Sequence, residues 1–397
     1  MKITSSLSIN KLINNYRNQY LSYKMNKGIV TNKVGQRLLS LDFLRGLIMV
    51  ALMIGETGFF QKLYQAFHNS FTQMLSIQFE HSEWHGLTFW DVILPAFMTM
   101  AGTAMAYSYK KQQQVGYSLK QSFLKVLKRS FWLLFWGILI YSVRGQHLNW
   151  QLSNVLTQLA FTTLIAFSVI NKPVWFQFTV TLLCLLIPEI LFRLIHIPGF
   201  DQPFVEFHNF GSYINKILGI KIDSEHKTNF INFIASGAHT TWGLMAGQLL
   251  LSAKSANQKF KYLVSFGLLA ILTGLTLDLT GITPMLKWIS TSSFVLVTGG
   301  MTLVIFAICY EWIDVRKHQN YLRFFTIVGM NSIFIYLFFI FIGDKWLNGY
   351  MEILCSQLLN FANVPLAVGA ALSCIVVFIL EWYLCYYLYK KKIFFKI

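Results

Sequence analysis

Long apolar runs, separated by shorter polar segments, dominate the chain. Each run is long enough to cross a bilayer as a helix, which takes roughly 17 to 25 residues. The runs are continuous, whereas a membrane barrel strand would alternate strictly over about ten residues, so the pattern predicts helices. Ten spans are predicted, at residues 43–60, 87–107, 122–142, 152–170, 174–195, 230–252, 262–280, 289–313, 324–343 and 364–389.

The composition supports a membrane protein. Hydrophobic residues make up 55% of the 397 residues and charged residues only 12%, a balance that soluble globular chains do not normally have. We therefore expect an all-α fold, a polytopic integral membrane helix bundle of about ten transmembrane helices. Residues 1–36 are polar and basic and form an N-terminal segment, and residues 37–397 form the transmembrane domain. The N-terminal segment lacks the apolar core of a secretory signal peptide, and Met25 is an alternative start.

Lysine and arginine indicate the orientation. With a cytoplasmic N-terminus, the inside segments hold 25 of the 33 basic residues, and eight remain outside. This asymmetry follows the positive-inside rule and predicts that both termini are cytoplasmic, as in a multi-pass protein of the cell inner membrane. Topology then explains the net charge of +17, and no nucleic-acid partner is expected.

The segment 80–91 carries the most informative chemistry. It places two histidines and three carboxylates at the start of the second predicted span. Ionisable groups are costly at membrane depth, and histidine exchanges protons near neutral pH, so His81 is a candidate proton carrier. His81 and His85 also have a spacing that could bind a metal. In the zinc-protease pattern, however, glutamate follows the first histidine, and here that residue is Ser82; no metal is expected.

Two further groups of ionisable residues flank the first span. Glu56 lies near its outer end, where a carboxylate could orient a histidine or bind a cationic amine. At its inner end, Asp42 and Arg45 are predicted to approach Lys128 and Arg129 on a neighbouring inside segment. Such a cluster would suit a polyanionic cofactor. Positive-inside topology alone is the alternative explanation.

Four segments, in this order, resemble the heparan-α-glucosaminide N-acetyltransferase family and its bacterial relatives associated with N-acetylglucosamine utilisation. They are Arg-Leu-Leu-Ser-Leu-Asp-Phe-Leu-Arg-Gly at 37–46, His-Ser-Glu-Trp-His-Gly-Leu-Thr-Phe-Trp-Asp at 81–91 with Pro95, Ser-Ser-Phe-Val-Leu-Val-Thr-Gly-Gly at 292–300, and Gly-Met-Asn-Ser at 329–332. The resemblance covers nearly all of the predicted membrane region.

The resemblance implies a reaction and a set of site residues. In that family an acetyl group from cytosolic acetyl-CoA passes to the amine of a glucosamine across the membrane, and a histidine of the H-x-x-W motif is catalytic. That histidine corresponds to His81, which we expect Glu56 to assist. Trp84, Asp91 and His239 are expected to bind the acceptor. The same resemblance suggests a homodimer.

The chain departs from the family pattern at two positions. The family usually has asparagine where this chain has Glu56, and the arginine of its V-L-Q-R-L pattern is replaced by Gln158. A direct transfer of the asparagine's role to Glu56 therefore does not follow.

The resulting hypothesis is a transmembrane acetyltransferase that uses acetyl-CoA as donor and an amino sugar or glycan as acceptor. Asp42, Arg45, Lys128 and Arg129 are the expected CoA contacts. A transporter of amino sugars or oligosaccharides, with ionisable residues as a relay, is the alternative. The sequence leaves open the acceptor sugar, and whether the acetyl group rests first on His81 or passes directly to the amine.

Overall fold

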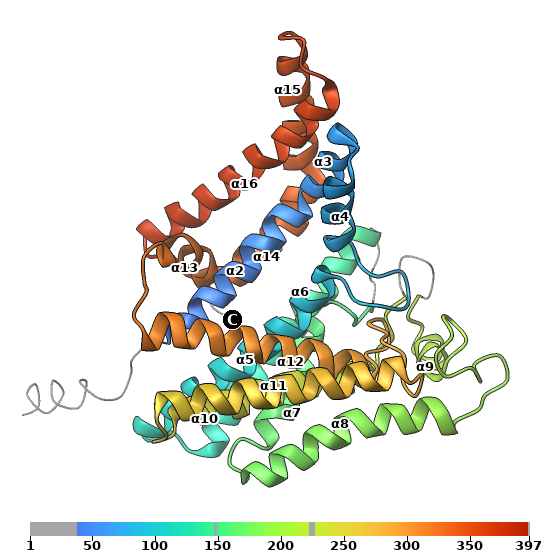
Figure 1. The fold of residues 1–397 in the computed structure, drawn as a ribbon, viewed down its shortest axis with the longest axis vertical. Coiled ribbons are helices and arrows are strands. Elements are labelled where there is room, and N and C mark those ends of the chain that lie inside the picture. The colour runs from blue at the N-terminus through green and yellow to red at the C-terminus, as the bar shows by residue number, and fades with distance from the viewer. Residues whose placement is uncertain (1–37, 147, 149, 222–226, 396–397) are drawn as a thin grey trace, which may run out of the picture. The chain divides into compact units, whose positions relative to one another are not determined.

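The computed structural model describes residues 38–146, 148, 150–221 and 227–395, and it divides the chain into two units at Leu38 and Leu39. The predicted N-terminal segment 1–36 lies outside the described residues. Within these ranges the regular secondary structure is helical, with no strand, so the prediction of an all-α fold is confirmed. Figure 1 shows the arrangement of the helices.

The longer helices occupy the predicted spans. They are α2 (Leu39–Glu56), α5 (Phe89–Gln114), α6 (Leu119–Gly145), α7 (Val155–Ser168), α8 (Val174–Leu194), α10 (Asn232–Leu251), α11 (Ala256–Leu279), α12 (Ser292–Cys309) and α16 (Leu366–Lys390). The shorter elements are α3 (Phe59–Phe67), α4 (Ser70–Gln78), α9 (Phe210–Ile217), α13 (Leu322–Met330), α14 (Ser332–Phe338) and α15 (Asn348–Asn360), with π-helical turns η1 (Tyr310–Val315) and η2 (Phe339–Leu347).

Six helices of the described chain are long and apolar enough to cross a membrane, and the pair α2 and α3, bent by 51°, would make a seventh. The protein therefore has the helices of a membrane-spanning protein. Helix α7, with 14 residues, is shorter than a usual span. Ten spans and two cytoplasmic termini stay predictions.

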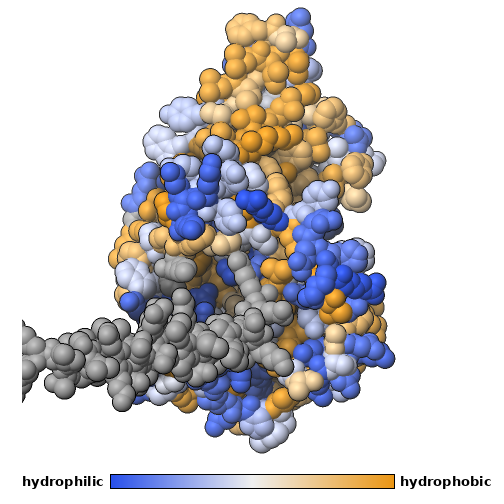
Figure 2. Space-filling view, turned by 90° about the vertical axis from the view of Figure 1, so that its left-hand side faces the viewer, coloured by the Kyte–Doolittle hydropathy of each residue, from blue (hydrophilic) through white to orange (hydrophobic). Residues whose placement is uncertain are grey.

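The helix after Asn331 is longer than the predicted span 324–343. It runs from α14 through η2 and α15 to Asn360, and α15 packs along α16. The apolar residues of α15 recur at helical spacing, which explains why the helix continues. Figure 2 shows a broad hydrophobic surface over this end of the molecule. Its exposed apolar residues include Tyr350, Ile353, Leu354, Leu358 and Phe361.

Helices α5 and α10 cross at very short distance because small residues meet at the crossing. A Cβ atom added to Gly102 would lie 1.9 Å from the carbonyl oxygen of Thr240, and one added to Gly243 would lie 2.0 Å from that of Thr99. The hydroxyl of Thr103 also donates to the carbonyl oxygen of Gly243, at 3.0 Å. Glycine and threonine allow such close contact in membrane helices. The crossing fixes α5 against α10, and both helices carry predicted site residues.

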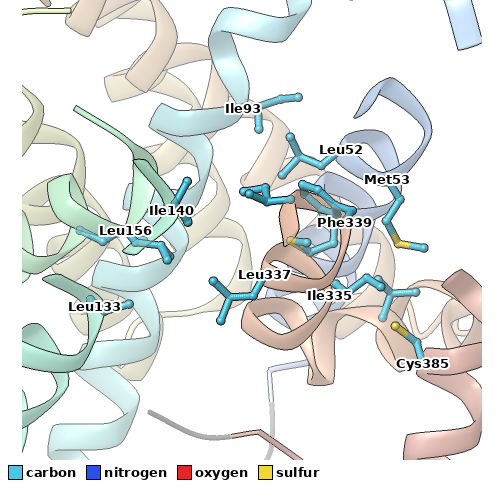
Figure 3. Packing of buried hydrophobic residues seen from close by; sticks show 14 of the residues in the cluster. Leu52, Met53, Ile93, Leu133, Ile140, Leu156, Ile335, Leu337, Phe339 and Cys385 are labelled. Carbon is cyan, nitrogen blue, oxygen red and sulfur yellow. The ribbon is translucent and has the colours of Figure 1, made fainter. Parts of the chain in front are cut away.

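The main apolar cluster contains residues of α2, α5, α6, α7, α13, α14, η2 and α16. Figure 3 shows Ile140 and Leu156, from α6 and α7, facing Leu52 and Phe339, from α2 and η2. Residues of this cluster line part of both cavities described below, Met49 and Leu133 in one and Leu52 and Ile140 in the other.

We expect Gly243→Ala to destabilise the protein, because its methyl group must push Thr99 and helix α5 away. Overpacking of this kind costs typically about 1 to 3 kcal/mol. Thermal unfolding in detergent should show a lower melting temperature. Gly349→Ala in α15 is the matched control, since nothing lies within 4 Å of its added Cβ. Equal melting temperatures for the two variants would contradict the close crossing.

Candidate functional site

A cavity of about 710 Å³ brings together four of the predicted site residues: Glu56, His81, Asp91 and His239. One part of its wall is aromatic and includes Trp90, Phe97, Trp288, Phe294 and Tyr336. Another part is polar and includes Tyr141, Ser153, Asn154, Gln158, Asn232, Ser236 and Ser290. The cavity can therefore bind a ligand that has both apolar faces and hydrogen-bonding groups.

Asp91 both starts helix α5 and binds His81. It occupies the third position of the helix, and its Oδ2 accepts hydrogen bonds from the backbone N–H groups of Ser82 and Thr88, each at 3.2 Å, and from the Thr88 hydroxyl at 3.1 Å. Its Oδ1 lies 2.8 Å from Nδ1 of His81. A capping carboxylate is stabilised by the positive end of the helix dipole. The hydrogen bonds from Ser82 and Thr88 thus fix the position of the Asp91 carboxylate, and the carboxylate fixes the orientation of the His81 ring.

The hydrogen bond defines the tautomer of His81. A carboxylate only accepts, so Nδ1 carries the proton and Nε2 retains a lone pair. The His81 side chain is 42% exposed, and it lines the larger cavity. Burial among these groups lowers the pKa of His81; the Asp91 hydrogen bond opposes this shift and the Lys287 charge adds to it. The lowered pKa favours the neutral form of His81, in which Nε2 can accept a proton.

Lys287 completes the charged group, and sequence reasoning missed it. Its Nζ lies 3.1 Å from Oδ1 of Asp91, the oxygen that also binds His81. The Lys287 side chain is 12% exposed and that of Asp91 is 0% exposed. Burial lowers the pKa of Lys287 to about 8, although Asp91 opposes the shift. A sequence signal existed, because Lys287 is one of the eight basic residues predicted on the outer side.

Trp84 and His85 make contacts outside the His81–Asp91 pair. The indole N–H of Trp84 donates to the carbonyl oxygen of Phe204 at 2.9 Å, and its ring packs in an apolar cluster with Phe210 and Ile289. Trp84 thus fixes the segment after α8, and a contact with substrate stays a prediction. His85 Nε2 lies 2.8 Å from Asp278. His81 and His85 belong to a non-helical segment and bind different carboxylates.

Two buried acceptors on residues that line the cavity, His239 and Gln158, bear on the kind of ligand it can bind. His239 donates through Nε2 to the carbonyl oxygen of Val295 at 3.1 Å, and its Nδ1 has no hydrogen-bond partner in the described structure. The amide nitrogen of Gln158 donates to Asn232 at 3.1 Å, and its Oε1 likewise has no partner. Buried polar atoms are normally satisfied. These two acceptors therefore favour a ligand that donates hydrogen bonds.

Glu56 lies at the end of α2 on the same cavity. The side-chain amide of Asn348 donates to its backbone oxygen at 3.2 Å, and the carboxyl group of Glu381 is close enough to interact with it electrostatically. Glu56 thus lines the same cavity as His81.

A second, smaller cavity of about 120 Å³ contains the predicted anion-binding arginines. Arg45 and Arg129 line it, and Arg129 is close enough to Arg45 for the like charges to repel. An Arg45 guanidinium nitrogen donates to the hydroxyl of Ser332 at 3.0 Å. Lys128 is exposed and Asp42 is half-buried, and neither is among the residues lining this cavity in the described structure. Of the four predicted CoA contacts, the structure therefore brings two together.

The two cavities adjoin. Phe97, Val155 and Tyr336 line both of them, one residue each from α5, α7 and α14. The arginine pair and the His81–Asp91 pair therefore lie on either side of a shared wall of three side chains.

Within the described part of the chain, no group of three His, Cys, Asp or Glu side chains is placed to hold a metal ion. Comparison with protein-family models and with curated proteins found no match to this chain.

We expect Asp91→Asn to destabilise the protein strongly, because it leaves the buried Lys287 ammonium without its counter-charge. Breaking a buried ion pair costs about 3 to 5 kcal/mol. The melting temperature in detergent is the measurement. Asp278→Asn, the same change beside the 60% exposed His85, is the control and should have a much smaller effect. If both variants melt alike, Asp91 is not held as described.

Proposed function

We propose that the protein is a transmembrane acetyltransferase that carries the acetyl group of cytosolic acetyl-CoA to the amine of an amino sugar on the opposite side. The single observation that carries this proposal is the pair of adjoining cavities, one with two guanidinium groups and one with a histidine–aspartate pair. The sequence resemblance to the N-acetyltransferase family points the same way.

The smaller cavity suits a phosphate group of the donor. Guanidinium groups bind phosphate oxygens in pairs, and two repelling arginines beside one cavity are stabilised by an anion between them. The pantetheine arm of CoA is long, thin and partly apolar. With the nucleotide near Arg45 and Arg129, the arm would pass Phe97, Val155 and Tyr336, and the thioester would reach the larger cavity.

The larger cavity suits an amino-sugar acceptor. Sugar rings present apolar C–H faces, which aromatic rings such as Trp90 and Trp288 can cover, and hydroxyl groups, which the amides can bind. Hydroxyl donors would satisfy Gln158 Oε1 and His239 Nδ1. The Glu56 carboxylate would attract the substrate ammonium before it loses its proton.

The neutral His81 supplies the base for amide formation. The substrate ammonium first releases one proton, since only a neutral amine attacks a thioester. Its nitrogen then bonds to the acetyl carbon, and Nε2 of His81 takes a second proton from the adduct. The C–S bond breaks, and the departing thiolate receives that proton from His81. The net products are the N-acetyl sugar, the CoA thiol and one proton.

A transporter would also need a cavity between helices, so the test must depend on CoA. Purified protein is incubated with acetyl-CoA, with and without glucosamine, and free thiol is measured. The proposal expects thiol release that requires both substrates and yields N-acetylglucosamine in equal amount. Binding of glucosamine without any thiol release, and with its uptake into vesicles, would favour the transporter.

We expect His81→Ala to lower the rate of thiol release at least about a hundredfold, because general-base catalysis contributes typically about 10² to 10⁴. CoA binding, measured by calorimetry, should be nearly unchanged. The control is His85→Ala, which removes the neighbouring histidine bound to Asp278 and should retain most of the activity. Equal losses in both variants would remove His81 from the chemistry.

We expect Arg129→Gln to raise the dissociation constant of CoA by about tenfold to a hundredfold, since a charged hydrogen bond is worth about 1.5 to 3 kcal/mol. The turnover number at saturating acetyl-CoA should change little, because phosphate contacts stabilise ground and transition states alike. Arg316→Gln, which removes an exposed arginine paired with Glu311, is the control. An unchanged dissociation constant in folded Arg129→Gln would contradict the donor site.

A further inference from the structure

We propose that Lys287 is a positioning residue of the acetyl-transfer site: through Asp91, its ammonium group keeps His81 neutral and correctly oriented as the base. This inference rests on the proposed function for its role in catalysis. The ion pair itself can be tested without that function.

Lys287 contacts Asp91, the carboxylate that binds His81, directly. Its Nζ and the Nδ1 of His81 approach the same oxygen of Asp91, at 3.1 and 2.8 Å. The other oxygen of Asp91 accepts three hydrogen bonds from Ser82 and Thr88. The carboxylate is thus held on every side, and its orientation determines that of the imidazole.

Charge balance explains why an ammonium is present. The Asp91 side chain has no exposure to solvent, and an ionised carboxylate in such a place needs a counter-charge. A neutral His81 does not supply one, so Lys287 must. If the lysine were absent, the nearest group able to neutralise Asp91 would be His81 itself, by becoming an imidazolium.

The turn that carries Lys287 also holds the segment that carries His81. The indole N–H of Trp288 donates to the carbonyl oxygens of Ser82 and Glu83, at 3.0 and 2.9 Å, and its ring lies edge-on to that of His81. The Lys287 ammonium lies over the Trp288 ring, 4.3 Å from its centre. Two successive residues therefore help to position His81: Lys287 through its contact with Asp91, and Trp288 through hydrogen bonds to the backbone of Ser82 and Glu83.

A consequence for proton transfer follows from the charges. Asp91 alone favours the protonated form of His81, and the nearby Lys287 charge favours the neutral form. A protonated imidazole cannot accept a proton from the amine. With the Lys287 ammonium nearby, Asp91 can orient His81 while the imidazole stays neutral and able to accept a proton.

Other titratable groups surround this trio. Glu80 and Glu83 flank His81 in the chain, and Lys227 pairs with Glu206 at 3.0 Å and donates to the backbone oxygen of Glu83. Three more titratable groups, Glu56, Lys221 and His239, line the larger cavity. Lys287 differs from all of these in contacting the carboxylate that binds His81.

The test is an NMR titration of His81 in isotopically labelled full-length protein, without substrates, with the signal assigned from His81→Ala. In Lys287→Met, and in Lys287→Gln should the first variant not fold, the titration midpoint is expected to rise by about 1 pH unit or more, the usual effect of losing a like charge within a few ångströms. Lys287→Arg should restore it. Lys227→Met is the control and should leave it unchanged.

The pH dependence of kcat/KM gives the second readout. Its acid limb, which reports the base of the free enzyme, should move to higher pH in Lys287→Met by the same amount as the His81 midpoint. The inference is overturned if Lys287→Met or Lys287→Gln folds and its His81 midpoint is unchanged. It is also overturned if the variant loses activity at every pH while the acid limb stays at the same pH. If the His81 midpoint shifts but the protein transfers no acetyl group, the action of Lys287 on His81 through Asp91 is supported and the proposed function alone is overturned.

Discussion

The buried carboxylate of Asp91 is the interaction on which the site depends. It begins helix α5, accepts hydrogen bonds from the loop that precedes the helix, and binds both His81 and Lys287. A charge so fully removed from water is stable only with good geometry and a counter-charge. The carboxylate therefore joins the start of helix α5, the turn before α12 and His81 through direct contacts.

Helix packing places these groups over the cavities. The small residues at Gly102 and Gly243 let α5 and α10 approach closely, which brings the Asp91 end of α5 and the polar face of α10 to one cavity. Helices α2 and α6 bring the two arginines to the neighbouring cavity. Phe97, Val155 and Tyr336 line both cavities and therefore lie at their junction.

Much of this could be predicted from the sequence, and the failures have physical causes. Apolar length predicted where the helices lie, and the ionisable residues at the start of a span predicted His81 and Asp91. Lys287 escaped notice because its partner lies nearly two hundred residues earlier, and only tertiary structure joins them. The directions of Trp84 and Lys128 could not be predicted either: Trp84 packs against an apolar cluster and Lys128 is exposed, and a contact of either with a ligand stays a prediction. Local sequence does not determine such directions.

The central claim is that an acetyl group crosses from a donor on one side to an amine on the other. The most direct test reconstitutes the protein in sealed vesicles, with acetyl-CoA on the side of its N-terminus and isotopically labelled glucosamine on the opposite side. The account predicts N-acetylglucosamine on the glucosamine side and the CoA thiol on the donor side, in equal amounts. Unmodified glucosamine accumulating on the donor side, with no CoA thiol formed, would contradict it.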